Sequence, residues 1–470
     1  MTARRLLWSA TIALFCLTAG CAVGPNYSKP SVPTPPQFRG AGPGTENQPS
    51  LAETKWANLF NDEALTGLIR TGLSDNFDVR IAAERVLQAR AALGISESQL
   101  FPTVNATGQF AAVRTSRIGA QNFVPPGISL DSSYTQAGFQ LGWELDVWGR
   151  IRRLNESARA QYFASEEARR GVITTLVSDI ATTYFALREL DLEIDIAVKT
   201  KAVAERGLQI TTARHDRGAA TGLDVHQAEQ FLFTATSQIA SIERQIGQAE
   251  NAMNLLLGRS PGDVPRGKAL EEFAIPPQIP AGLPSELLAR RPDIRQAEQT
   301  LISANAEIGA AKAQYFPQIA LTSFVGGQSR ALTSLLTGTG RSWNFAPAAT
   351  LPIFNAGRLR NNVRLTEAQE RAALLAYERS IQSAFREVSD ALIGYRKTSD
   401  QTNEQQKLVK ALQESDRLST LRYQGGLDSY LQVLDARRNL FTGELLLAQL
   451  RREELLSIVR LYRALGGGWQ

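Results

Sequence analysis

The chain repeats itself, and the repeat covers most of its length. The segment Gly149-Arg150-Ile151-Arg152 recurs 208 residues later as Gly357-Arg358-Leu359-Arg360, whereas Phe101-Pro102 recurs 215 residues later as Phe316-Pro317. The seven-residue difference lies between the two motifs, in a segment with the pattern of a β-hairpin. A duplicated supersecondary unit leaves this trace, because loops change length while their flanks stay in register. We therefore expect one pseudo-symmetric unit made of two copies.

The N-terminus has the order of a secretory signal: a basic start, a long apolar run and small residues before Cys21. Small residues directly before a cysteine resemble a bacterial lipobox, in which the cysteine becomes the new N-terminus and carries lipid such as palmitate. Thr18 stands where the lipobox usually has leucine, and an ordinary signal peptide is the alternative. By resemblance to lipoprotein sorting, Ala22 at the following position points to the outer membrane.

Composition limits the class of protein. Removal of the signal also removes Cys16, which leaves one cysteine and no internal disulfide. Lys and Arg number 51 against 46 Asp and Glu, an excess too small and too dispersed to indicate nucleic acid. No apolar run of about 18 or more residues follows the signal, so we expect no transmembrane helix and expect any membrane insertion to use strands.

Proline placement separates an extended tether from long helices. Residues 22–50 contain seven prolines and predict an extended segment without a core of its own. No proline lies between Gly127 and Ser260 or after Pro352, and a proline inside a helix costs about 3 kcal/mol. These two tracts are therefore the natural places for long helices.

Within these tracts, apolar residues at steps of three, four or seven predict helices from Arg150 to about Asp216 and from Arg358 to about Gln424. A helix of this length extends for about 100 Å at about 1.5 Å per residue. Each breaks at a glycine-containing turn and returns, which makes each copy a long α-hairpin. The returning helices are predicted over Leu223–Leu257 and Asp428–Leu465.

The segments before the long helices alternate between apolar and polar residues, which is the pattern of half-exposed strands. Strands are predicted to run to Val147 in the first copy and to Ile353 in the second, each with a partner strand that begins at Thr103 or Gln318. Strands of this length cross a bilayer when tilted. Four strands cannot close a barrel, and open edges are not tolerated in lipid, so closure requires several copies of the chain.

These patterns give the expected organisation in sequence order. It comprises a lipoprotein signal peptide (1–20), a lipidated tether (21–50), a first repeat (51–260) with a β-pair (about 103–147) and an α-hairpin (about 150–257), a linker (261–285), and a second repeat (286–470) with a β-pair (about 318–353) and an α-hairpin (about 357–465).

Four motifs carry a resemblance to a known family: Cys21–Tyr27, Arg291–Glu298, Tyr315–Pro317 and Val433–Ala436. They resemble the TolC-like outer membrane factors, nearest to the OprM/NodT type of efflux lipoprotein, over essentially the whole mature chain. The resemblance implies a mainly α fold with a transmembrane β part, in which a homotrimer forms a 12-stranded β-barrel continuous with an α-helical periplasmic tunnel. It also implies a periplasmic adaptor and an inner-membrane pump, proton-driven, as partners.

The same resemblance makes the helical tips the candidate periplasmic mouth and adaptor-docking site. Charged, hydrogen-bonding or turn-forming residues beside the two turns are Arg214, Asp216, Gly218, Asp224, Arg422, Tyr423, Gly426 and Asp428. A purely conformational role is the alternative for the glycines. The charged and hydrogen-bonding groups would hold the mouth closed through interactions between neighbouring helices. Three copies of Asp428 are hypothesised to form an acidic ring on the axis; the alternative is that Asp428 faces a neighbouring helix.

Other residues are assigned to the β part. Gly149 and Arg150, with Gly357 and Arg358, are predicted to mark the strand-to-helix transitions. An aromatic girdle is one interpretation of the larger aromatic side chains, and packing in the periplasmic body is the other. The aromatic residues concerned are Trp143, Trp148, Trp343 and Phe345.

No catalytic machinery is predicted. The sequence has no P-loop, nucleophile elbow or dinucleotide fingerprint, and His215 and His226 lack the further donors of a metal site. We expect no enzyme activity, no metal and no cofactor beyond the lipid on Cys21. The leading hypothesis is an outer-membrane exit duct for small amphipathic or toxic compounds; the alternatives are a duct for type I protein secretion and a coiled-coil periplasmic scaffold or adaptor.

Overall fold

The protein is described from a computed structural model, which describes residues 22–41, 50–53, 56–116, 127, 129–274, 280 and 282–468. The signal peptide and Cys21 lie outside these residues. The chain divides into two compact units. The sheet unit comprises residues 1–30, 87–164 and 297–376, and the helical unit comprises residues 31–86, 165–296 and 377–470.

The secondary structure follows the duplicated order expected from the sequence. Before the linker the elements are η1 (Leu51–Glu53), α2 (Trp56–Phe60), α3 (Glu63–Asp75), α4 (Phe77–Ser98), β1 (Thr103–Arg114), β2 (Asp131–Leu145), α5 (Arg150–Asp216) and α6 (Gly222–Leu256). The remaining elements are η2 (Leu270–Glu272), α7 (Pro284–Arg290), α8 (Pro292–Ala313), β3 (Gln318–Ser329), η3 (Leu332–Ser334), η4 (Gly338–Gly340), β4 (Arg341–Thr350), α9 (Arg358–Gln424) and α10 (Tyr430–Ala464).

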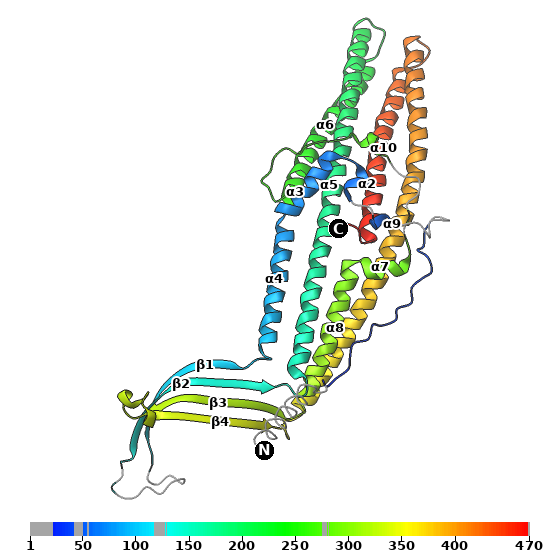
Figure 1. Cartoon of the computed structure of the whole chain (residues 1–470). Helices are drawn as coiled ribbons and strands as arrows, with labels where there is room; N and C mark the ends of the chain where they lie inside the picture. Colours follow the sequence, from blue (N-terminus) through cyan, green and yellow to red (C-terminus); the bar gives the residue numbers. More distant parts are fainter. Residues whose placement is uncertain are drawn as a thin grey trace. The chain divides into compact units, whose positions relative to one another are not determined.

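The four strands form one antiparallel sheet in the order β1-β2-β3-β4 (Figure 1). The central pairing, β2 with β3, therefore joins the two copies. At the start of β3, Ile319 pairs with Leu145 of β2, and Gln318 pairs with Thr350 of β4. Strand β2 thus ends before Val147 and β4 before Ile353, where longer strands were expected, because β3 begins at Gln318 and offers no further partner.

The helices repeat in length as well as in order. Helices α5 and α9 have 67 residues each, and α6 and α10 have 35 each. The long helices predicted from the apolar spacing are confirmed at both ends. Helix α10 begins at Tyr430, two residues later than expected, because Ser429 has extended N-cap geometry, with φ −75° and ψ 158°.

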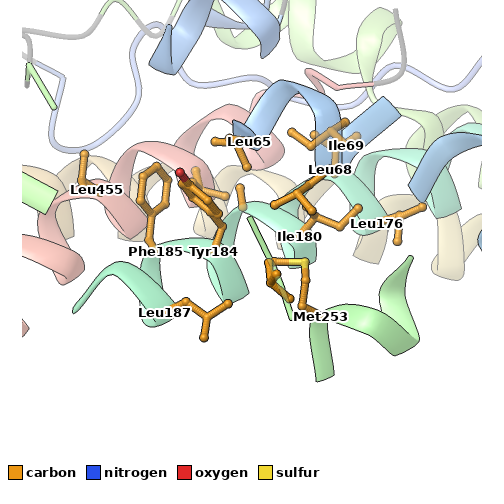
Figure 2. Packing of buried hydrophobic residues seen from close by; sticks show 14 of the residues in the cluster. Leu65, Leu68, Ile69, Leu176, Ile180, Tyr184, Phe185, Leu187, Met253 and Leu455 are labelled. Atoms are coloured by element: carbon orange, nitrogen blue, oxygen red, sulfur yellow. The ribbon is translucent and has the colours of Figure 1, made fainter. Parts of the chain in front are cut away.

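The core of the helical unit lies where α3 packs on α5, α6 and α10. Leu65, Leu68 and Ile69 of α3 face Ile180 and Tyr184 of α5 (Figure 2). Each fully buried aliphatic side chain of this kind contributes about 1.5–3 kcal/mol. Edge-to-face aromatic rings extend the core. The ring centroid of Phe185 lies 4.9 Å from that of Phe60 and 5.2 Å from that of Phe273.

A buried carboxylate ties this core together. Asp62, 3% exposed, accepts hydrogen bonds from the Leu65 N–H (2.8 Å), the Tyr184 hydroxyl (3.0 Å) and the Lys268 N–H (2.9 Å). It is therefore at once the N-cap of α3 and the link between α5 and the segment after α6. Gly267 is required beside it, because a Cβ there would lie 2.5 Å from both carboxylate oxygens.

A second buried acid predicts a pH dependence of stability. Burial raises the pKa of Glu189 from 4.5 to about 7, and Glu193 and Glu453 add to this effect while Arg452, 2.5 Å away, opposes it. A raised folded-state pKa means that protonation favours the folded chain. The free energy of unfolding should therefore fall as pH rises from about 4.5 to about 7.

Glu189→Gln should remove much of this slope, measured by urea unfolding of the helices at several pH values. The matched control is Glu243→Gln, which changes an exposed glutamate of α6. An identical slope in wild type and Glu189→Gln would contradict the assignment.

Candidate functional site

The sheet gathers its apolar side chains on one face, here called the apolar face. One cross-strand row of this face consists of Ala106, Phe139, Val325 and Trp343, which pair in sequence across all four strands. The last three side chains are 62, 60 and 77% exposed. Continuous exposed apolar surface of this kind marks contact with a partner or a membrane. Further members of the face are Val104, Phe110, Leu141, Trp143, Leu321, Phe345 and Pro347.

The opposite face of the sheet is polar, as the period of two requires. Its side chains are mostly amides, hydroxyls and one carboxylate: Asn105, Thr107, Gln109, Gln136, Gln140, Glu144, Thr322, Gln328 and Asn344. Phe324 is a large apolar side chain on this face, and it packs over Gly138 and Gly326, which pair directly across β2 and β3. A Cβ on either glycine would lie within 2.9 Å of the ring.

Of the four aromatic residues considered for a girdle, Trp143, Trp343 and Phe345 lie on the apolar face. Trp148 follows β2 and lies outside the strands. Its ring stacks on Phe316 at 4.8 Å, and its indole N–H donates to the Pro317 carbonyl at 2.9 Å. Packing is therefore the role of Trp148, whereas a girdle of the other three remains a prediction.

Gly149 and Arg150 lie between β2 and α5. Gly149 has φ +79°, a conformation that side chains disfavour, and Arg150 is the first residue of α5. Asp146 caps this helix by accepting from the N–H groups of Ile151 (3.0 Å) and Arg152 (2.8 Å). A carboxylate at a helix N-terminus is favoured by both hydrogen bonding and the helix dipole.

The second transition has the same backbone geometry with a weaker cap. Gly357 has φ +82° and precedes Arg358, the first residue of α9. Asn355 accepts from the Leu359 N–H at 3.4 Å, where the first copy has a charged cap.

The N-terminal segment docks on the sheet unit directly after Cys21. The Val23 N–H donates to the Trp148 carbonyl at 3.0 Å, and the Arg153 guanidinium donates to the Asn26 side chain at 2.8 Å. Gly309 of α8 allows this approach, because a Cβ there would lie 2.7 Å from the Val23 carbonyl oxygen. Cys21 itself lies outside the described residues, so its lipid attachment stays a prediction.

At the first tip, Gly218 has φ +73° and closes the turn after α5. Asp224 is engaged locally, since its carboxylate accepts from the Thr221 N–H and hydroxyl at 2.8 Å in a capping box. Asp216 is exposed and lies 3.6 Å from His215. Asp224 therefore stabilises its own helix.

At the second tip, Gly426 has the equivalent conformation, with φ +72°. Here Arg422 of α9 donates to Asp428 through two nitrogens, Nε at 2.6 Å and Nη2 at 3.2 Å. This hydrogen bond lowers the pKa of Asp428 from its ordinary value. Asp428 is thus half of an ion pair rather than a bare carboxylate.

The two tips contact each other through Arg214 of the first hairpin. Position 220, which corresponds to Asp428 in the repeat, is Ala220, so Arg214 has no equivalent acid in its own turn. Its guanidinium instead lies 4.5 Å from the ring centroid of Tyr423 in the other hairpin, within cation–π range. Tyr423 also packs on Tyr430 at 5.3 Å. The two equivalent arginines therefore make different contacts, Arg422 within its own hairpin and Arg214 between the hairpins.

The remaining polar candidates do not cluster. In the described part of the chain, no three His, Cys, Asp or Glu side chains are grouped so that they could hold a metal ion. His226 pairs with Glu229 at 2.8 Å on the surface. Across those same residues, no helix combines the length and apolar character needed to cross a membrane.

Some of these contacts were missed by sequence reasoning. The cap by Asp146 had a local signal, an acid a few residues before the helix start. The docking of Arg153 and Gly309 on the N-terminal segment had none, because partners that lie 127 or more residues apart leave no periodic pattern.

Comparison with known proteins identifies relatives along nearly the whole chain. A family model described as outer membrane efflux protein matches residues 68–259 and 283–467. The solvent efflux pump outer membrane protein SrpC of Pseudomonas putida is 39% identical, with 96% of each chain covered. The cation efflux system protein CusC of Escherichia coli is 35% identical, with 97% of this chain and 98% of CusC covered. The solved open-state outer membrane channel MtrE of Neisseria gonorrhoeae superposes with a TM-score of 0.84 at 31% identity, covering 96% of this chain and 99% of MtrE.

Proposed function

Because the chain belongs to the outer membrane efflux protein family, we propose that it is the outer-membrane exit duct of a tripartite efflux system. The observation that carries this function is the sheet with one apolar and one polar face. Such a sheet suits a wall between lipid and a water-filled passage. The long paired helices extend the passage into the periplasm.

The duct is a homotrimer. Strands β1 and β4 are the two edges of the sheet, and edge strands present unpaired backbone N–H and C=O groups. In hydrocarbon these groups must be paired. Pairing β4 of one copy with β1 of the next satisfies both edges, and three copies give a barrel of twelve strands.

The partners are a periplasmic adaptor at the helical tips and an inner-membrane pump, proton-driven. The cargo is a small amphipathic or toxic compound. The names of the relatives mention solvents in one case and cations in another, which favours efflux of small species over protein secretion. The pump rather than the duct then selects the compound.

A lipid on Cys21 anchors the N-terminus. Residues directly after it are held on the sheet unit by Arg153, and Gly309 leaves room for them. This docking would place an acyl chain beside the base of the strands. The acylated cysteine and the strands then enter the same membrane.

The tips are the closed mouth of the duct. Two contacts hold them, the Arg422–Asp428 ion pair within the second hairpin and the Arg214–Tyr423 contact between hairpins. Three chains would carry three ion pairs around the axis. Opening requires the hairpins to separate, which breaks the contact between Arg214 and Tyr423.

Arg422→Ala should raise the cation preference of the pore several-fold, because it leaves three carboxylates without their counter-charge near the mouth. Asp428→Ala should shift the preference towards anions. Both are measured as reversal potentials of single channels of the purified trimer in planar bilayers under a salt gradient.

Arg417→Ala is the matched control. Arg417 makes a similar two-nitrogen ion pair with Glu414 on the same helix, at 2.8 and 2.6 Å, away from the turn. Unchanged reversal potentials in all three variants would contradict the placement of the Arg422–Asp428 pair at the mouth. A folded trimer that forms no pores would contradict the duct function itself.

A further inference from the structure

The apolar face contains a hollow that the duct function does not use. The cavity has a volume of about 680 Å³, within the range of small-ligand sites. Its floor is a cross-strand row of small residues, in which Gly108 pairs with Ala137 and Ala137 with Gly327. Neighbouring strands lie about 4.8 Å apart, so this row extends for about 14 Å across the four strands from β1 to β4.

The loop between β3 and β4 forms one wall of this hollow. Leu335 and Leu336 line it, and Leu336 is 87% exposed. The loop backbone lies directly over Gly327, because a Cβ at that position would overlap the Leu335 carbonyl oxygen. Glycine at 327 therefore leaves room for the loop to lie on the apolar face.

The opposite wall is the adjacent row of larger side chains. Phe139, Val325 and Trp343 project from the same face one pair further along the strands. The hollow is thus a trough with a smooth floor between two apolar walls. It opens on the apolar face, so its occupant comes from the surroundings of that face and not from the polar passage.

One end of the trough is cationic. Arg341 pairs with Gly327 in the register and lines the cavity. Among the described residues it has no acidic partner within salt-bridge distance, whereas Arg114, near the end of β1, pairs with Asp131 at 3.5 Å. An apolar trough that ends at an uncompensated guanidinium is complementary to an acyl chain with an anionic headgroup.

We propose that this trough binds a membrane lipid that carries a phosphate headgroup, with an acyl chain between the Leu335–Leu336 wall and the Trp343 wall and the phosphate on Arg341. The proposal rests on the proposed function, because it requires the apolar face to lie in the membrane. The bound lipid would hold the loop against the strands.

Trp343 provides the readout. The trimer is reconstituted in vesicles containing phosphatidylglycerol or phosphatidylcholine with brominated acyl chains, which quench tryptophan fluorescence on contact. The difference between wild type and Trp343→Phe isolates the signal of this residue. Quenching by brominated phosphatidylglycerol should reach half-maximum at a mole fraction about fivefold lower than with phosphatidylcholine, as expected for one basic residue near an anionic lipid.

Two variants test the two parts of the site, and each has a matched control. Gly108→Leu should abolish the preference by filling the trough, since the space above Gly108 is open and accepts a side chain; Ala112→Leu adds the same group on the same face of β1 outside the trough. Arg341→Gln should make the two lipids equal, and Arg114→Gln should not.

The outcomes separate the proposal from the function on which it rests. The lipid site would be overturned if both lipids quench Trp343 equally and if Gly108→Leu and Arg341→Gln do not change the quenching. If the pores still conduct, the duct function is unaffected by this result. No quenching of Trp343 by either lipid, with no conductance, would overturn both.

Discussion

Phe110→Arg should prevent the protein from inserting into bilayers, whereas Gln109→Arg should leave insertion intact. The two residues are neighbours in β1 and both are exposed in the single chain. They lie on opposite faces because successive side chains of a strand alternate. An arginine on the lipid side of a strand costs up to about 2–4 kcal/mol per chain, depending on its depth, and a trimer incurs this cost three times.

Co-flotation with vesicles and pore conductance measure the result. Helical content by circular dichroism serves as the folding control, because α5, α6, α9 and α10 do not depend on the substituted position. Equal insertion of both variants would show that the apolar face is not the lipid-facing face. Loss of insertion in both variants would contradict the assignment of Gln109 to a face that tolerates charge.

Asp62→Ala should destabilise the helical unit by about 3–5 kcal/mol, because each buried donor left without a partner costs about 1–3 kcal/mol. The change removes the acceptor of the Leu65 and Lys268 N–H groups and of the Tyr184 hydroxyl. Asp62→Asn should cost less, since its amide oxygen can still cap α3. Denaturant titration of the helical signal gives the free energy of unfolding.

Glu63→Ala is the matched control, since Glu63 is exposed in the first turn of the same helix. Its loss removes only a favourable interaction with the helix dipole, about 0.3–1 kcal/mol. Similar destabilisation by both substitutions would contradict the role of the buried carboxylate. Gly267→Ala, which presses a methyl group against the Asp62 carboxylate, should resemble Asp62→Ala.

The sequence predicted the elements well where local chemistry sets them. The apolar spacing from Arg150 to Asp216 identified α5, and the alternation around Phe139 identified a strand with two distinct faces. The positive φ values at Gly218 and Gly426 lie in the two turns that their glycines suggested. Strand ends were less predictable, because Val147 and Ile353 continue the alternation but have no partner on β3.

The tip residues show the same division. Their positions beside the turns followed from the repeat, but their partners did not, because the sequence left open whether Asp428 faces the axis or a neighbouring helix. The structure pairs Asp428 with Arg422 and directs Arg214 to Tyr423. The two arginines occupy equivalent positions of the repeat, and the sequence offers an acid beside Arg422, Asp428, where the first copy has Ala220. Only the structure shows that Arg214 contacts Tyr423 instead.

The sequence by itself determined the lengths of the four long helices and the two faces of the strands, because periodicity, glycine and proline act over a few residues. The repeated motifs indicated the duplication, and the resemblance of four motifs indicated the family. Only the tertiary structure decided that β2 pairs with β3 across the copies, that Asp62 binds a hydroxyl and N–H groups from three parts of the chain, and that the loop beside Gly327 covers part of the apolar face. These contacts join residues far apart in the chain, and their free energy depends on burial and geometry that exist only after the helices and strands have packed.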